Sequence, residues 1–104
     1  MKIIKKLSDM IEDELDGAKC YAKSALELRD EDKDLADILY DLSNEEMRHL
    51  QILHSQVTRI INAYRKEQGE PPPAMLAIYD YLHKKHIDQA EEVKRYQALF
   101  KEGL

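Results

Sequence analysis

The longest helical pattern of the chain is centred on the stretch Asn44-Glu45-Glu46-Met47-Arg48-His49-Leu50. Glu46 and His49 are three residues apart, so on a helix they project from one face about one turn apart. They belong to a series at four-three spacing, which is typical of the packed face of a helix: Leu42, Glu46, His49, Leu53, Gln56 and Ile60. Charged groups inside proteins are usually paired or bound to a metal. A carboxylate and an imidazole in this series are therefore the main functional clue.

Length and composition indicate a single all-α domain spanning residues 1–104. A chain of 104 residues can build one modest core but not two. Charged residues make up 36% of the chain, and it has only 3 Gly and 3 Pro, the prolines being consecutive. Alternating β-branched residues, the signature of strands, are absent from the sequence. The expected class is therefore a helical bundle.

Charge and cysteine content narrow the expected partners and location. The formal net charge is −5 with acids and bases interleaved, so we expect no nucleic-acid partner. No apolar run approaches the roughly 20 residues that cross a bilayer, so we expect no membrane partner either. The lone Cys20 fits a reducing compartment, and the first six residues lack a signal-peptide core. These features favour a cytoplasmic protein in which Cys20 is not a nucleophile.

Turn signals divide the chain into three helices, expected at about 3–28, 33–66 and 74–101. The acidic segment 29–32 forms a short turn in which Asp30 or Asp32 can cap the second helix. Gly69 and the prolines at 71–73 end that helix and open the third. Short connections make consecutive helices antiparallel, so we expect a three-helix antiparallel subunit.

The first helix carries its own charged residue in an otherwise apolar series. Its expected packed face consists of Ile4, Leu7, Ile11, Glu14, Ala18, Tyr21, Ala25 and Leu28. Glu14 and Glu46 are equally distant from a turn centred near residue 30, so an antiparallel hairpin brings their carboxylates to the same height. His49 then lies about one turn along. Small residues beside Glu14, such as Gly17, would let a partner helix approach closely.

Two carboxylates and a histidine inside a bundle suit a transition-metal site. Carboxylates neutralise and bridge ions such as iron or manganese, and imidazole adds a nitrogen ligand. Di-iron bundles take a Glu from each of two helices and Glu-x-x-His from each of two others. This chain supplies half of that set, so two copies related by a two-fold axis would supply all of it. Their four carboxylates would balance two divalent ions, whereas one copy alone could hold a single ion.

The segment from Glu14 to Leu53 resembles the first helical hairpin of the ferritin-like superfamily, which includes rubrerythrins and ferritins. The matching residues are Glu14, Tyr21 and the stretch 44–49. The half-site is similar to that of encapsulated ferritins, whose short subunits build a di-iron site across a dimer interface. The resemblance implies that Glu14, Glu46 and His49 bind the metal.

The same resemblance implies a function and an assembly. Ferrous iron would be oxidised by dioxygen or peroxide, with two ions per dimer, which makes the chain a candidate ferroxidase and oxidoreductase. The dimer, or a higher homo-oligomer, would complete a four-helix-bundle site. Manganese or zinc could take the place of iron.

Other interpretations remain open. The chain could be a non-enzymatic helical interaction module in which buried Glu and His residues only set helix packing. A small helix rotation would replace Glu46 by Glu45, although we expect Glu45 to face solvent. His83 and His86 have a spacing that could bind zinc, but the two lysines between them oppose a cationic ligand.

The third helix is expected to pass the site. Its packed face runs through Met75, Tyr79, Leu82, His86, Gln89, Val93, Tyr96 and Phe100. A turn centred near residue 70 places residue 94 at the height of Glu46. Val93 and Tyr96 would then lie near the site, where the Tyr96 hydroxyl could hydrogen-bond a ligand. His86 would lie near the height of His54.

Overall fold

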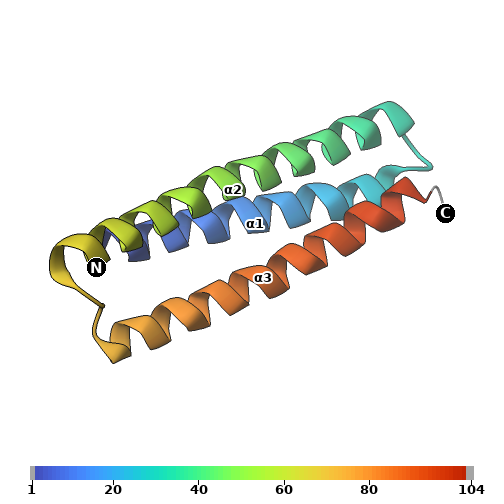
Figure 1. Cartoon of the computed structure of the whole chain (residues 1–104). Coiled ribbons are helices and arrows are strands. Elements are labelled where there is room, and N and C mark those ends of the chain that lie inside the picture. Colours follow the sequence, from blue (N-terminus) through green and yellow to red (C-terminus); the bar gives the residue numbers. More distant parts are fainter. Residues whose placement is uncertain (1, 103–104) are drawn as a thin grey trace.

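The computed structural model describes residues 2–102 and contains three helices in that range (Figure 1). They are α1 (Lys2–Leu28), α2 (Lys33–Gln68) and α3 (Pro73–Lys101), with no strand among the described residues. The predicted all-α class is confirmed, and every helix end lies within two residues of its expected position. Residues 1, 103 and 104 of the expected domain lie outside the described residues.

The helices form an elongated bundle with principal extents of 55 × 18 × 18 Å. α1 packs along both other helices, whereas α2 and α3 touch each other very little. Figure 1 shows why: α3 diverges from α2 towards the connection between them, and α1 runs between the two. The α1–α2 pair is thus the main packing unit, with α3 laid against it. None of these helices, within residues 2–102, combines the length and apolar character needed to cross a membrane.

The helix ends follow the turn chemistry of the sequence. Of the two candidate capping residues it is Asp32 that caps α2, where its carboxylate accepts a hydrogen bond of 3.0 Å from the backbone N–H of Leu35. Gly69 ends the same helix with a φ of 82°, a conformation that favours glycine. Pro73 then opens α3, where its missing N–H costs nothing.

The tightest part of the core is built from small residues. Ala18, Ala22, Ala25 and Ala36 are fully buried, which lets α1 and α2 approach closely. In the same layer the buried Ser43 hydroxyl donates a hydrogen bond of 2.7 Å to the Ala18 carbonyl. It also accepts one of 2.9 Å from the Gln97 side chain of α3, so one hydroxyl links all three helices.

The packed faces are rotated slightly from the expected ones. On α1, residues missing from the predicted series complete the core, namely Ser8, Leu15 and Ala22. On α2 the buried residues are Ala36, Ser43 and Leu50, whereas Leu42 and His49 are exposed. The predicted series of α1 still supplies Ile4, Ile11, Ala18 and Ala25 to the core, and all buried residues of α3 belong to its predicted series. On α2 the predicted series runs along the edge of the core.

Candidate metal centre

The structure brings Glu14, Glu46 and His49 together where α1 and α2 meet. One potential ligand atom from each residue lies within 4.8 Å of the other two. His49 Nδ1 lies 3.3 Å from Glu14 Oε2. All three sequence-predicted site residues thus share one place in the fold, although their binding of a metal stays a prediction.

Local features of both helices account for this convergence. The short turn between α1 and α2 sets the two carboxylates at the same height, and the Ser43–Ala18 hydrogen bond lies one turn away along α2. Gly17 adds space, because a Cβ atom built at that position would lie 3.5 Å from Glu46 Oε2. That distance is ordinary van der Waals contact. Glycine therefore leaves a gap beside the Glu46 carboxylate that a methyl group would fill.

The site carries an electrostatic imbalance that a cation would relieve. A shared hydrogen bond with the Glu14 carboxyl, burial and the negative charge of Glu14 all raise the pKa of Glu46, whereas His49 acts in the opposite direction. Two carboxylates this close repel each other when both are ionised. A divalent ion between them would offset that repulsion.

The trio is only partly covered. The Glu14 side chain is 25% exposed and that of His49 is 46% exposed, because the trio lies at the edge of the core. Two carboxylate groups and one imidazole form a donor set that suits Fe²⁺, Mn²⁺ or Zn²⁺. Three ligands leave coordination positions open to water, to dioxygen or to a second set of ligands.

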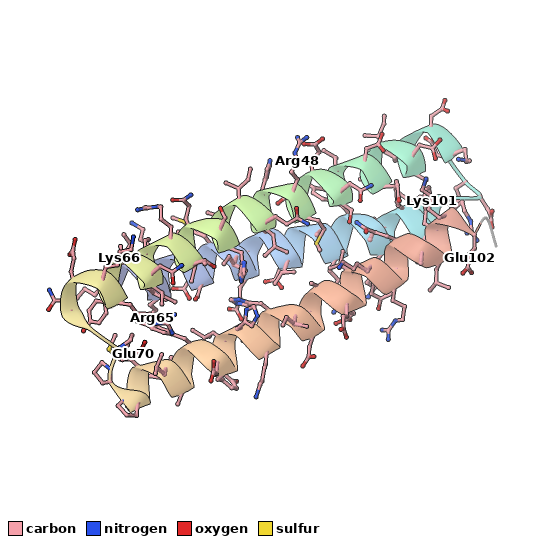
Figure 2. All side chains as sticks on the ribbon, in the orientation of Figure 1. Arg48, Arg65, Lys66, Glu70, Lys101 and Glu102 are labelled. Carbon is pink, nitrogen blue, oxygen red and sulfur yellow. The ribbon has the colours of Figure 1, made fainter. Side chains whose placement is uncertain are left out.

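Glu45 takes no part in this group. It is exposed and forms an ion pair with Arg48, one turn along the same helix. Figure 2 shows Arg48 on the outer side of α2, away from α1 and α3. The expectation that Glu46 lies with the site residues and Glu45 faces solvent agrees with this geometry.

Two residues of α3 were expected near the site. Val93 is part of the buried core. The Tyr96 ring lies within 6.0 Å of the ammonium of Lys23 and 5.7 Å of the guanidinium carbon of Arg95. Within residues 2–102 its hydroxyl makes no hydrogen bond to the trio, and its ability to hydrogen-bond a bound ligand stays a prediction.

Exposed apolar side chains flank the trio on both helices. Met10 precedes Glu14 by four residues, and Leu42 precedes Glu46 by four. One heptad further out lie Ile3 on α1 and Leu35 on α2. All four of these hydrophobic residues are exposed. We call this set, Ile3, Met10, Leu35 and Leu42, the apolar stripe. It places uncovered hydrophobic surface on the same helical faces as the three potential ligands.

Sequence reasoning missed a second group of histidines. His54 of α2 lies against His83 of α3, with His54 Nε2 and His83 Nδ1 separated by 3.3 Å. The sequence pattern had paired His83 with His86 on one helix instead. The signal was available in the α2–α3 alignment, which puts His54 level with residue 86, about one turn from His83.

Comparisons of the chain with protein-family models, with curated proteins and with solved structures gave no match. The interpretation of the Glu14–Glu46–His49 group consequently rests on its own geometry and chemistry.

Proposed function

We propose that the chain binds divalent iron through Glu14, Glu46 and His49 and that a homodimer oxidises it. The observation that carries this proposal is the convergence of two carboxylates and one imidazole from two helices, with ligand atoms within 4.8 Å. Each of the three residues departs from an apolar series, and the departures meet at one point. A pair of Glu residues whose charges repel has a clear use where a cation is bound.

The second copy of the chain is the partner that we propose for the apolar stripe. A two-fold axis beside the trio would bring two Glu-Glu-His groups face to face and cover the stripe of each chain with that of the other. Such self-complementary interfaces are the commonest kind in oligomers. The assembled site would have four carboxylates and two imidazoles, the ligand set of di-metal bundles. Two divalent ions would balance its charge.

Each residue has a definite task in this proposal. Glu14 and Glu46 would be bridging or terminal ligands of the metal ions, and His49 would add one neutral nitrogen ligand to each ion. The contact between His49 and Glu14 holds the imidazole in the group before an ion arrives. Ferrous ion is then the substrate: each ion gives up one electron, and dioxygen or peroxide accepts the electrons at the open positions.

A different function is supported by the same contact. The bond between His49 and Glu14 joins α1 to α2 without any ion. A helical interaction module could use such a polar contact to fix helix alignment, and its apolar stripe would then bind another protein. Metal content separates the two proposals.

Loading with ferrous iron under anaerobic conditions tests the main proposal. We expect about one ion per chain, following the half-site ligand count of di-metal bundles, and conversion to ferric ion on admission of air. Glu45→Ala is the matched control, because Glu45 neighbours Glu46 but faces solvent. A protein that retains no iron, manganese or zinc after loading would leave only the interaction module.

A further inference from the structure

A second cluster of nitrogen ligands lies between α2 and α3. His54 Nε2 and His83 Nδ1 are 3.3 Å apart, and their rings stack with centroids separated by 5.1 Å. His86, one turn beyond His83, is buried, and its Nε2 has no hydrogen-bond partner within residues 2–102. His54 follows His49 by about 7.5 Å along α2 and is turned from it by roughly 140° about the helix axis. The two clusters therefore face different sides of α2.

The three histidines line a pocket of about 330 Å³. Figure 1 shows that α3 diverges from α2 towards this end of the bundle. Residues of all three helices line the pocket. Most of the wall is apolar, with Ile4, Ile11, Val57, Ile61, Leu76 and Leu82 among its residues. Asp80 also lines it, one turn before His83, and its side chain is exposed. The pocket thus has room for an ion with water ligands beside a small number of polar groups.

The separation of the two ring nitrogens permits a shared ion as well as a hydrogen bond. Two nitrogens bound to one tetrahedral ion at about 2.0–2.1 Å lie about 3.3–3.4 Å apart. The observed 3.3 Å therefore needs little rearrangement of the two rings to accept an ion.

Local charge permits a cation at this place. Lys85, next to His86, is held in an ion pair of 2.5 Å with Glu12 of α1, which neutralises it. Arg65, which also lines the pocket, is held in an ion pair of 3.3 Å with Glu70. The lysines that opposed a zinc site in the sequence are thus partly offset in the fold.

We propose that His54 and His83 form a second metal site, selective for a borderline ion such as Zn²⁺ or Cu²⁺, which fastens α3 to α2. Imidazole favours these ions, and Cu²⁺ binds such ligands most tightly among the divalent first-row metals. Water completes the coordination, and the unpartnered Nε2 of His86 hydrogen-bonds a water ligand. Because α2 and α3 otherwise touch very little, one ion bound by both helices would link them where they diverge. This site is independent of the proposed iron site.

The test uses the full chain with the first site removed. Glu46→Gln/His49→Ala should bind one Cu²⁺ or Zn²⁺ per chain, and the electron paramagnetic resonance spectrum with Cu²⁺ should show coupling to two imidazole nitrogens. Adding His54→Gln or His83→Gln should lower the affinity at least ten-fold. Lys84→Gln is the matched control, since it neighbours His83 without offering a comparable ligand, and it should keep the site.

A second measurement covers the case in which the double variant fails to fold. In the otherwise unchanged chain, His83→Gln should bind one Zn²⁺ fewer than the parent. Amide hydrogen exchange in residues 73–86 should slow on addition of Zn²⁺ to the parent and not to His83→Gln. Equal Zn²⁺ binding and equal exchange in the two proteins would show that His54 and His83 form a hydrogen bond only. Neither result depends on whether the Glu14–Glu46–His49 group binds iron.

Discussion

His49 Nδ1 lies 3.3 Å from Glu14 Oε2, although the two residues are 35 positions apart in the sequence. The contact crosses the junction of α1 and α2 and includes the imidazole that we propose as a metal ligand. An ion that enters must therefore replace this contact with bonds to both residues. A site with only three protein ligands cannot lose one of them and still compete with water, so each of the three side chains is individually necessary for tight binding.

Substitution of single ligands should accordingly abolish tight binding. We expect Glu46→Ala and His49→Ala each to weaken Mn²⁺ or anaerobic Fe²⁺ binding by more than about 100-fold, above the loss typical of outer-shell substitutions. Isothermal titration calorimetry measures this effect. Glu45→Ala should bind like the parent protein. Stoichiometric binding by His49→Ala would mean that another face of α2 holds the metal.

Removing one of the two repelling carboxylates should stabilise the metal-free protein. The hydrogen bond with Glu14 and burial raise the pKa of Glu46, so an ionised Glu46 opposes folding at neutral pH. Glu46→Gln keeps the shape and removes the charge. Its free energy of unfolding, measured by urea denaturation with chelator at pH 7, should exceed that of the parent.

With metal present, the parent should have the higher free energy of unfolding and Glu46→Gln the lower one. A metal ion whose free concentration is about 100 times its dissociation constant stabilises the folded parent by about 2.7 kcal/mol. Glu46→Gln should lose most of that stabilisation. Glu45→Gln serves as the control for removing one negative charge from α2. A Glu46→Gln protein that is less stable than the parent under chelation would contradict the proposed repulsion.

Dimer formation should depend on metal. In the metal-free dimer four carboxylates would lie near one axis and oppose association, and divalent ions would reverse that effect. Sedimentation across a concentration series should show a lower dimer dissociation constant with Fe²⁺ or Mn²⁺ than with chelator. Glu14→Gln should reduce the difference, because it removes two of the four charges.

The apolar stripe provides a separate control for the same assembly. Leu42→Lys should weaken the dimer, whereas Ile52→Lys should not, because Ile52 is exposed on the side of α2 that carries Glu45. A protein that binds metal and stays monomeric throughout would restrict the site to a single chain.

Acid should destabilise the metal-free protein through His86. Burial lowers the pKa of His86, the positive charge of Lys85 and the nearby His83 and His54 lower it further, and Glu12 opposes them. A lowered pKa means that the folded state prefers the neutral ring. This contribution to stability is present above the unfolded value of about 6.5 and is lost as the pH falls through the lower folded value.

Denaturation curves with chelator between about pH 7.5 and pH 5 measure this effect, because this interval includes the ordinary histidine pKa of about 6.5. The parent should lose stability over this interval by no more than about 1.4 kcal/mol per pH unit for one proton. His86→Gln should show a smaller slope, and Asp88→Asn, a nearby exposed change, should leave the slope intact. An unchanged slope in His86→Gln would assign the acid sensitivity to another group.

Gly17 offers a further test of how the site is spaced. Gly17→Ala should raise the free energy of unfolding by about 1 kcal/mol, because alanine favours the helix and its methyl group fits at ordinary contact distance. Thermal denaturation under chelation measures the gain. A loss of stability would show that the Glu46 carboxylate cannot tolerate the methyl group beside it.

The sequence predicted the helices and the meeting of the three site residues for local reasons. Asp32, Gly69 and Pro73 act within one turn of their own positions, so they fix helix ends without tertiary structure. A short turn likewise equates the heights of Glu14 and Glu46. These features depend only on counting residues along antiparallel helices.

The rotation of α2 could not be obtained in the same way. Two adjacent four-three series on α2 contain apolar residues, and the choice between them depends on how α1 packs against it. The burial of Ser43 shows the difficulty, since a serine becomes core only because Ala18 and Gln97 satisfy its hydroxyl. For the His54–His83 pair the alignment of α2 with α3 gives only the height of the two residues, and their contact also depends on the rotation and divergence of α3.

The fully buried alanines of α1 and α2 have a consequence for metal selectivity. Their methyl groups help to set the distance between the axes of α1 and α2. Glu14 lies on α1, and Glu46 and His49 lie on α2, so the same distance separates the three side chains. A larger side chain at Ala18 or Ala22 would therefore widen the spacing of the three proposed ligands without contacting any of them. Ions differ in the bond lengths that they accept, and the preferred ion can thus drift in evolution through residues that never contact it.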